Sequence, residues 1–287
     1  MGCQLPRTTA RRCLAEFFVR ALLVTATAWV VAACSEAPVD LSAPVQSLPI
    51  GVLGAEPIAS EQLADTERAN LLNHDGAPYA WILRFEHDTH EPLLLAAPET
   101  GLSGAAAFAD DGIEALVGSG FVTEVASLEP VGLLQLDGRT LNPLLQHGYT
   151  RILGIADGNT LGVLHRDAYQ REIFHAALQA GPGVIEAGAL DISERDLARP
   201  KYFRAFVVLC DDSTLIGASL EPTHLRTLGE RLLTYFESRG LACSEVVNLA
   251  GDREALLMRR HNDGRVLYQG DPNTHKVALI AFRRRSP

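Results

Sequence analysis

Few residues in this sequence have both the type and the spacing of a catalytic or metal-binding motif. His87 and His90 stand in His-Asp-Thr-His, a group of side chains that could ligate a metal. On a strand these two histidines would point to opposite faces, so the segment is better interpreted as a polar hairpin turn. His165 and His175 lie on different predicted elements and lack a flanking carboxylate motif. The sequence contains no zinc-protease, serine-hydrolase, phosphate-loop or dinucleotide-binding motif, so we expect neither a metal nor a cofactor.

The N-terminus has the composition of an export signal. Residues 1–34 begin with a basic region and continue into an apolar run at 21–33, which is short for a membrane span but typical of a signal peptide. The run ends in Val-Ala-Ala-Cys, which resembles the lipobox of bacterial lipoproteins, where the cysteine (here Cys34) becomes the lipidated first residue. An ordinary signal peptide cleaved near Ala33, or a short anchor, is the alternative. Ser35 resembles the pattern of lipoproteins sent to an outer membrane, so we expect a lipid-anchored cell-envelope protein that faces the periplasm.

Composition and charge limit the class of protein. The chain has 287 residues, of which 47% are hydrophobic and 21% are charged. It is long enough to bury a core, and its composition is too apolar for a disordered chain. Residues 1–34 hold four arginines and one glutamate, so the rest has 21 basic and 34 acidic residues, a net charge of −13. Nucleic acid needs a basic surface and is not expected as a partner, and the membrane would be reached through lipidated Cys34. Residues 35–60, rich in Ser, Pro, Ala and Val, are interpreted as a flexible tether before a domain at 61–287.

The cysteines leave one pair in the mature chain. Cys3 and Cys13 would leave with the signal and Cys34 would carry lipid, so Cys210 and Cys243 remain. In an oxidising envelope these two can form one disulfide, and two buried reduced thiols are the alternative.

Hydrophobic patterning predicts hairpins interleaved with helices. Strands are predicted at 79–85, 91–97, 132–136, 151–155, 160–165, 204–210, 214–219, 245–249, 255–259, 266–269 and 277–282. We expect the first two to pair. The turns at Asp157-Gly158 and Asp211-Asp212 predict two hairpins, of 151–155 with 160–165 and of 204–210 with 214–219. Helices are predicted within 103–116, from an Asp167 cap to Gln179, and from a Thr223 cap to Gly240. The fold class that follows is α+β, with a mainly antiparallel or mixed sheet and two or three packed helices.

Five short motifs occur in a fixed order along the predicted domain. They are a glycine turn at 117–122, a Pro-x-Gly-Leu strand with an Asp-Gly turn at 130–138, Gln-Ala-Gly-Pro at 179–182, an Arg-led strand at 204–208 and Asn-Leu-Ala-Gly-Asp-Arg-Glu at 248–254. In this order they resemble the phosphodiester glycosidase (uncovering-enzyme-like) domain family over most of 75–285. The sequence departs from the family pattern at two turns, where Gly118 replaces an asparagine and Ala250 replaces an aspartate.

The resemblance implies a phosphodiester glycosidase-like fold and a hydrolase of glycosyl phosphodiesters or related envelope glycans. Cleavage at an anomeric carbon passes through an oxocarbenium-like state that carboxylates stabilise or attack, while the phosphate needs a cation or N–H donors. The candidate catalytic residues are Asp252 and Glu254, and the candidate substrate-binding residues are Arg204, Asn248, Gly118 and Gln179. Because both departures fall at the turns, a catalytically degenerate lipoprotein that binds a glycan, sugar-phosphate or protein partner is the alternative function.

Each candidate residue also has a purely structural interpretation. Arg204 could pair with an acid at a strand edge, and Asn248 could hydrogen-bond the backbone of its turn. The sequence Gly-Asp-Arg-Glu that contains Asp252 and Glu254 is typical of solvated surface. Gln179 could cap local backbone at a helix end.

Overall fold

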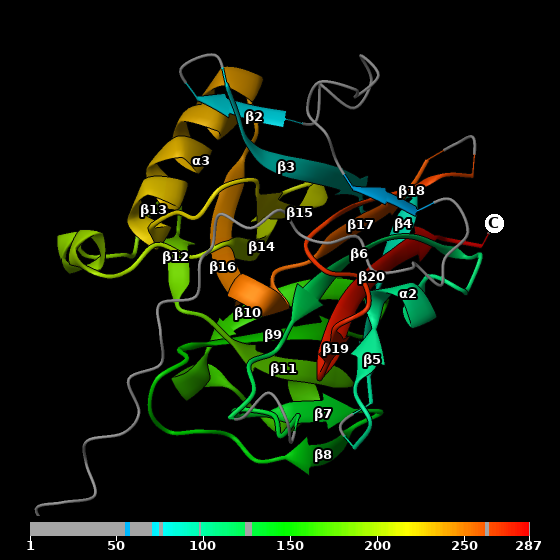
Figure 1. Ribbon diagram of the computed structural model, residues 1–287. Helices are drawn as coiled ribbons and strands as arrows, with labels where there is room; N and C mark the ends of the chain where they lie inside the picture. The colour runs from blue at the N-terminus through cyan, green and yellow to red at the C-terminus, as the bar shows by residue number, and fades with distance from the viewer. Residues whose placement is uncertain are drawn as a thin grey trace, which may run out of the picture. The chain divides into compact units, whose positions relative to one another are not determined.

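Three β-sheets stack around a shared core in the computed structural model (Figure 1). The structure describes residues 55–57, 71–74, 77–97, 99–123, 128–261 and 264–286, with the side chains of 55–57, 71, 73 and 74 excepted. All of these lie in the unit Pro49–Pro287. The predicted signal at 1–34, with Cys34, lies outside the described residues, as does the predicted tether except for residues 55–57. Those three residues form a strand rather than part of a tether.

The seven-stranded sheet carries the Arg-led strand and the last glycine turn. Its order is β13-β12-β16-β14-β15-β3-β2, with β2 Leu71–His74, β3 Ala77–Glu86, β12 Gly183–Glu186, β13 Ala189–Leu190, β14 Arg204–Cys210, β15 Ser213–Ser219 and β16 Cys243–Gly251. The predicted hairpin of β14 and β15 is confirmed. Cys210 and Cys243, opposite each other on β14 and β16, are joined by a disulfide.

The six-stranded sheet carries the first glycine turn. Its order is β1-β18-β17-β6-β20-β4, with β1 Ala55–Pro57, β4 His90–Ala96, β6 Ile113–Ser119, β17 Leu257–Arg260, β18 Val266–Gln269 and β20 Ala278–Arg284. The predicted strand at 91–97 is present as β4, but it pairs with β20 instead of β3, so the predicted pairing is wrong. The turn after Glu86 sends the chain to a second sheet, and the sequence pattern carries no signal for that choice.

The remaining strands form two smaller sheets. The five-stranded sheet has the order β10-β9-β11-β7-β8, with β7 Leu134–Leu136, β8 Arg139–Asn142, β9 Arg151–Ala156, β10 Thr160–His165 and β11 Ala176–Ala180. The predicted hairpin with its turn at Asp157-Gly158 is confirmed. The predicted turn at Asp137-Gly138 is present and leads into β8, a strand that was not predicted. A short pair joins β5 Leu102–Ser103 to β19 His275–Lys276.

The predicted α+β class with two or three packed helices is wrong, because the described chain is predominantly β-sheet. It contains two α-helices, α2 Gly104–Ala107 and α3 Leu225–Arg239, and α2 is a single turn. The rest of its helical structure is four 3-10 turns: η1 Arg166–Ala168, η2 Arg171–Ile173, η3 Glu194–Ala198 and η4 Asp252–Glu254. No helix in the described part of the chain combines the length and the apolar character that a membrane crossing requires.

The predicted helix from Asp167 to Gln179 fails for a physical reason. Its second half is β11, five buried residues that pair with β9 on one side and β7 on the other. Alanine, leucine and glutamine favour a helix locally, but the ladder bonds and burial available in the centre of a sheet outweigh a propensity of a few tenths of a kcal/mol per residue.

The long helix α3 is confirmed at its C-terminus and differs at its N-terminus. Gly240 ends it in the left-handed conformation, as a helix-terminating glycine does. The cap residue is His224, without a side-chain hydrogen bond, while the Thr223 hydroxyl bonds the hydroxyl of buried Tyr79. The apolar side of α3 packs on one face of the seven-stranded sheet, against Val184 and Phe206 among others.

The opposite face of that sheet forms the main core. Trp81 and Val207 of the seven-stranded sheet, Val117 and Ile280 of the six-stranded sheet and Leu178 of the five-stranded sheet belong to one buried cluster. This packing fixes the ends of β6, β14 and β16 relative to one another. The predicted site residues other than Gln179 lie at those ends or directly after them.

Candidate functional site

The site is built where strand β14 begins and strand β16 ends. Arg204 and Gly251 are opposite each other in the antiparallel register, and Ala205 is opposite Ala250. One step further Phe206 is opposite Asn248, so Leu249 is an extra residue that forms a β-bulge. The bulge turns the end of β16, and the 3-10 turn η4 follows directly with Asp252 at φ 49°.

The first glycine turn meets the last one at η4. The N–H of Gly118 on β6 donates to the Leu256 carbonyl at 2.8 Å. A Cβ added at Gly118 would lie 2.4 Å from the Glu254 carbonyl oxygen, closer than real Cβ atoms come. Glycine at 118 therefore lets the backbone of η4 pack directly against β6, and Gly118 offers no side chain to a ligand.

The Gln-Ala-Gly-Pro segment is tied to the same strand end through Asn248. The Gly181 N–H donates to the Asn248 carbonyl at 2.9 Å, the Asn248 N–H donates to the Pro182 carbonyl at 3.2 Å, and the Asn248 side-chain amide donates to the Gly181 carbonyl at 3.3 Å. Asn248 is 1% exposed, and its Oδ1 has no hydrogen-bond partner in the described chain. In this structure Asn248 holds backbone together and is not presented at the surface.

Arg204 uses only part of its guanidinium on the described residues. It is half-buried; its backbone N–H donates to Ser219 Oγ at 2.9 Å and its Nε lies 3.5 Å from the Thr223 carbonyl. Its two terminal nitrogens have no hydrogen bond or ion pair with any residue the structure describes. The guanidinium lies 5.0 Å from the centre of the Tyr202 ring. Burial lowers the pKa of Arg204 while Asp196 and Asp252 raise it, and an arginine stays charged under such conditions.

The two candidate carboxylates lie in different environments. Asp252 is exposed, and the Arg204 charge partly offsets the desolvation that raises its pKa. The Glu254 side chain is 12% exposed, neither of its oxygens has a hydrogen-bond partner within the described chain, and burial raises its pKa. Only Asp252 is therefore placed to meet a ligand beside Arg204.

Lys276, which sequence reasoning missed, is the partner of Glu254. It is fully buried, and its Nζ donates to the Arg253 carbonyl at 2.9 Å and lies 3.7 Å from Glu254 Oε2. Burial lowers the pKa of Lys276 and the Glu254 charge raises it. A lone lysine in a polar stretch is typical of surface, so no local signal distinguishes Lys276 from an exposed residue.

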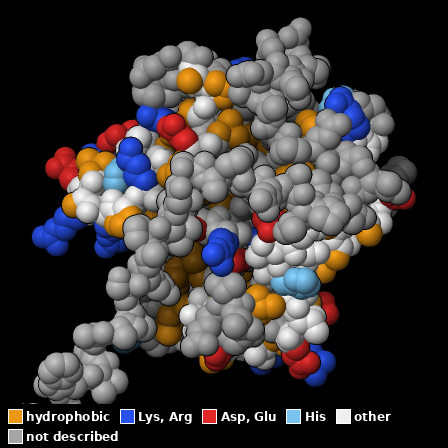
Figure 2. All heavy atoms as spheres, viewed as in Figure 1, with side chains coloured by type: hydrophobic (Ala, Val, Ile, Leu, Met, Phe, Trp, Pro, Cys, Tyr) orange, Lys and Arg blue, Asp and Glu red, His pale blue; other side chains and the backbone are white. Residues whose placement is uncertain are grey.

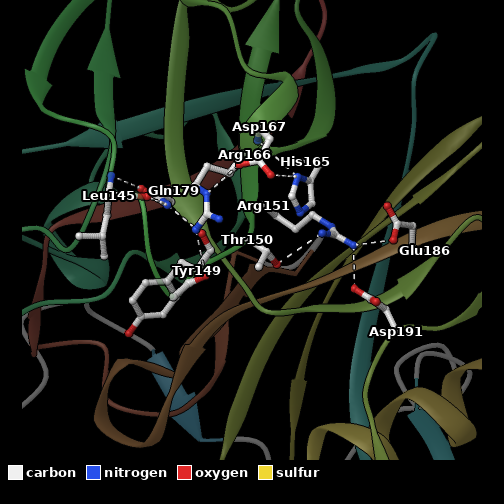
Figure 3. A network of polar contacts seen from close by, with 11 residues as sticks. Leu145, Tyr149, Thr150, Arg151, His165, Arg166, Asp167, Gln179, Glu186 and Asp191 are labelled. Carbon is white, nitrogen blue, oxygen red and sulfur yellow. Dashed lines mark hydrogen bonds and ion pairs between the residues drawn. The ribbon is translucent and has the colours of Figure 1, made fainter.

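Gln179 belongs to a polar network that fixes a loop of the five-stranded sheet (Figure 3). It lies in β11, not at a helix end. Its Oε1 accepts from the N–H groups of Leu133 and Leu145, and its Nε2 donates to the carbonyls of Leu145 and Tyr149. All four bonds go to backbone, so the side-chain amide has no capacity left for a ligand.

The same network contains a buried arginine that the motifs did not indicate. Arg151 on β9 is 2% exposed, and its Nη2 lies 2.7 Å from Asp191 and 3.0 Å from Glu186 (Figure 3). A Cβ at Gly183 would lie 2.7 Å from that nitrogen, so this glycine makes room for the guanidinium. Arg151 thereby links the five-stranded sheet to the β12–β13 hairpin of the seven-stranded sheet.

The comparisons with known proteins show a likeness in fold to one solved structure. No protein-family model matches this chain, and no curated protein matches its sequence. Among solved structures it is similar to the catalytic domain of zebrafish N-acetylglucosamine-1-phosphodiester alpha-N-acetylglucosaminidase, auto-inhibited by its pro-peptide, with a TM-score of 0.51, 12% identity, and coverage of 74% of this chain and 86% of that one. This chain is distantly similar in structure to a phosphodiester glycosidase domain. A hypothetical protein from Synechocystis has a TM-score of 0.49 at 11% identity, over 75% of this chain and 61% of that one.

At this identity the likeness to the glycosidase domain shows the fold alone, so the site must be judged on its own residues. Ala250 stands where the resemblance places an aspartate, and it is fully buried in the main core. Figure 2 shows acidic, basic and hydrophobic side chains mixed on one face of the molecule. No group of three or more His, Cys, Asp and Glu side chains in the described ranges is arranged to hold a metal ion.

Proposed function

We propose that this chain is a cell-envelope lipoprotein whose glycosidase-fold domain binds a phosphate-linked glycan, the class of ligand in which a sugar is joined to a phosphodiester. The single observation that carries the proposal is the Arg204 guanidinium, half-buried beside Asp252 with its terminal nitrogens unpaired among the described residues. A planar guanidinium binds phosphate through two parallel N–H bonds.

The neighbouring groups suit the sugar. Asp252 can accept hydrogen bonds from sugar hydroxyls, because an ionised carboxylate has free acceptor positions. Tyr202 is 37% exposed and presents an aromatic surface next to Arg204. The strand register and the hydrogen bond from the Asp252 N–H to the Phe203 carbonyl at 3.0 Å hold these groups in place before a ligand arrives.

The lack of a second exposed carboxylate beside Asp252 in the described part of the chain favours binding without turnover. Glycoside hydrolysis uses two carboxyl groups that flank the scissile bond. Here Glu254 is buried against Lys276, and Ala250 has no carboxylate. Asp252 is left as the exposed carboxylate of η4.

Hydrolysis of a glycosyl phosphodiester is the second candidate, and one observation favours it. Desolvation raises the pKa of Asp252, as expected of a carboxyl group that donates a proton to a leaving oxygen. In that case Arg204 would bind the phosphate leaving group.

The envelope location is proposed from the sequence. The lipobox-like end of the signal would place a lipid on Cys34, and Ser35 favours the outer membrane with the domain in the periplasm. The disulfide between Cys210 and Cys243 is compatible with an oxidising compartment.

The test measures binding and turnover separately. Calorimetry with a panel of glycosyl phosphodiesters, including N-acetylglucosamine 1-phosphodiesters, reports affinity, and release of free sugar reports hydrolysis. We expect Arg204→Ala to weaken binding by roughly tenfold or more, because a hydrogen-bonded charge contributes about 1.5–3 kcal/mol. Arg139→Ala removes an exposed arginine of β8 and should leave binding unchanged.

The outcomes separate the two candidates. Binding without sugar release supports recognition alone, and sugar release that Asp252→Asn abolishes supports hydrolysis. Wild-type protein that neither binds nor cleaves any member of the panel would remove both functions.

A further inference from the structure

Strand β4 is the edge of the six-stranded sheet, and one side of its backbone has no partner. It pairs with β20 alone in the described structure. The Ala97 N–H donates to the Val277 carbonyl, and the Arg285 N–H donates to the Thr89 carbonyl. In an antiparallel ladder hydrogen-bonded pairs alternate, so these bonds assign the odd-numbered residues of β4 to β20. The backbone groups of Pro92, Leu94 and Ala96 therefore point away from the sheet.

Those outward groups are unpaired where the strand is most apolar. Neither the N–H nor the carbonyl of Leu94 or Ala96 has a hydrogen-bond partner among the described residues. The outward carbonyl of His90, by contrast, accepts from the Arg285 side chain at 3.1 Å. Exposed edges are usually blocked by charge or proline, and after Pro92 this one carries neither.

The unpaired edge opens into a cavity. Residues 92–97 form one wall of a cavity of about 420 Å³. The facing wall comes from the five-stranded sheet and includes Leu136, Ile155 and Ala176. The cavity is thus a slot with backbone donors and acceptors on one side, and on the other apolar side chains together with Asp137, Asn159 and His175.

We propose that this slot binds an extended peptide segment of a partner protein, which adds to β4 as a further strand. Another extended backbone can hydrogen-bond the alternating N–H and carbonyl groups of a strand edge. Pockets beside the edge then bind the side chains of the added strand and select among them. The edge at residues 92–96 is about as long as four or five extended residues at ~3.3 Å each. At the N-terminal end of β4 the slot is closed by the five-stranded sheet, where Asn159 Nδ2 donates to Glu91 Oε2 at 2.8 Å. A short extended segment fits beside this contact, whereas the long sheet edge of a second copy of this chain would collide with it.

The lining also sets the chemistry of the segment. Asp137 is exposed at the slot, and no lysine or arginine lines it. We therefore expect small apolar side chains and a basic residue near Asp137, with no acidic residue. The slot shares no residue with the site around Arg204, so this proposal stands independently of glycan binding.

Amide hydrogen exchange on the full folded domain tests the proposal. Without peptide, the Leu94 and Ala96 amides should exchange at least about tenfold faster than those of Leu93 and Leu95. Blocked tetrapeptides built from Val, Ala, Leu and Lys should slow exchange at Leu94 and Ala96, and the same peptides with Glu in place of Lys should not. Equal protection of all four amides in free protein, or no peptide that protects the two outward amides, would overturn the proposal.

A backbone variant makes the test specific. Leu94→Pro removes the N–H of residue 94, which points away from β20, as the backbone of Pro92 does. The hydrogen bonds between β4 and β20 are therefore kept. We expect it to abolish peptide protection at Ala96, whereas Leu94→Ala, which keeps the N–H, should retain most of it. Should Leu94→Pro fail to fold, Ala96→Pro makes the same test with protection read at Leu94. A dimer that light scattering detects, and that Leu94→Pro dissociates, would show that β4 pairs with a second copy of this chain. That result would also contradict the proposal.

Discussion

At the scale of single residues, the turn η4 depends on an ion pair that is shielded from water. Lys276 is fully buried, and its ammonium group bonds the Arg253 carbonyl and faces Glu254. A buried pair contributes little net stability, but removal of one partner leaves the other charge in a poor solvent. The position of η4, and so of Asp252 beside Arg204, rests on both members of the pair.

We expect Lys276→Met to lower the free energy of unfolding by about 3–5 kcal/mol at neutral pH, because Glu254 is left buried without its cation. Burial raises the pKa of Glu254, so the folded state binds its proton more readily than the unfolded chain does. The stability that protonated Glu254 provides is present at low pH and is lost as the pH rises through its raised pKa. The penalty of Lys276→Met should therefore shrink as the pH is lowered from 7 toward 5.

Urea denaturation at several pH values measures this effect. Lys201→Met, at an exposed lysine, is the matched control and should change little. Glu254→Gln added to Lys276→Met should recover part of the loss and flatten its pH dependence. A penalty that is the same at pH 5 and pH 7 would contradict the account of the pair.

The sequence indicated which residues lie close together better than it indicated what surrounds each of them. The ordered motifs include positions that lie close together in the fold, Gly118, Asn248, Arg204 and the turn η4, and their roles in a site stay predictions. The structural alternative, in which Asn248 and Gln179 bond backbone, is the one that the structure shows, but their partners at Gly181, Leu145 and Tyr149 are set by tertiary packing and not by the local sequence. Lys276 and Arg151 were missed for the same reason, since a buried charge is defined by partners far away in sequence.

At the scale of elements, strands were predicted where apolar runs are bounded by turn residues, and most hairpins follow. The failures share one cause. The predicted helix from Asp167 to Gln179 and the predicted pairing of the first two strands both depended on local pattern, and both were overridden by the choice of sheet. Sheet membership is decided by long-range burial, which a single sequence does not display.

The close approach of η4 to β6 gives a prediction at this scale. Gly118→Ala should lower the free energy of unfolding by about 2 kcal/mol or more, because its Cβ would lie 2.4 Å from the Glu254 carbonyl oxygen and backbone must move. Gly251→Ala, on the neighbouring strand end, meets nothing closer than Arg204 Nη1 at 3.5 Å and should be tolerated. Thermal unfolding of the two variants decides the matter, and equal stability would mean that β6 and η4 are not rigidly packed.

At the scale of the whole molecule, the domain and its proposed anchor have separate roles. The chain after residue 34 has a net charge of −13, so anionic lipid headgroups would repel it. Attachment would then depend on the acyl chains at Cys34, each buried CH₂ of which contributes about 0.8 kcal/mol. If Cys34 carries lipid as proposed, charge repulsion would keep the acidic domain from lying on an anionic membrane surface.

This separation predicts how the full chain distributes in a bacterial host. Cys34→Ser should move the protein from the membrane fraction to the soluble periplasmic fraction and abolish incorporation of labelled palmitate. Cys13→Ser is the matched control, because this cysteine would leave with the signal, and it should change neither readout. The released protein should not rebind vesicles of anionic lipid at low salt, where charge repulsion is strongest. Membrane retention of Cys34→Ser would show that the N-terminal segment acts as a protein anchor and that the lipidated cysteine is not what holds the domain.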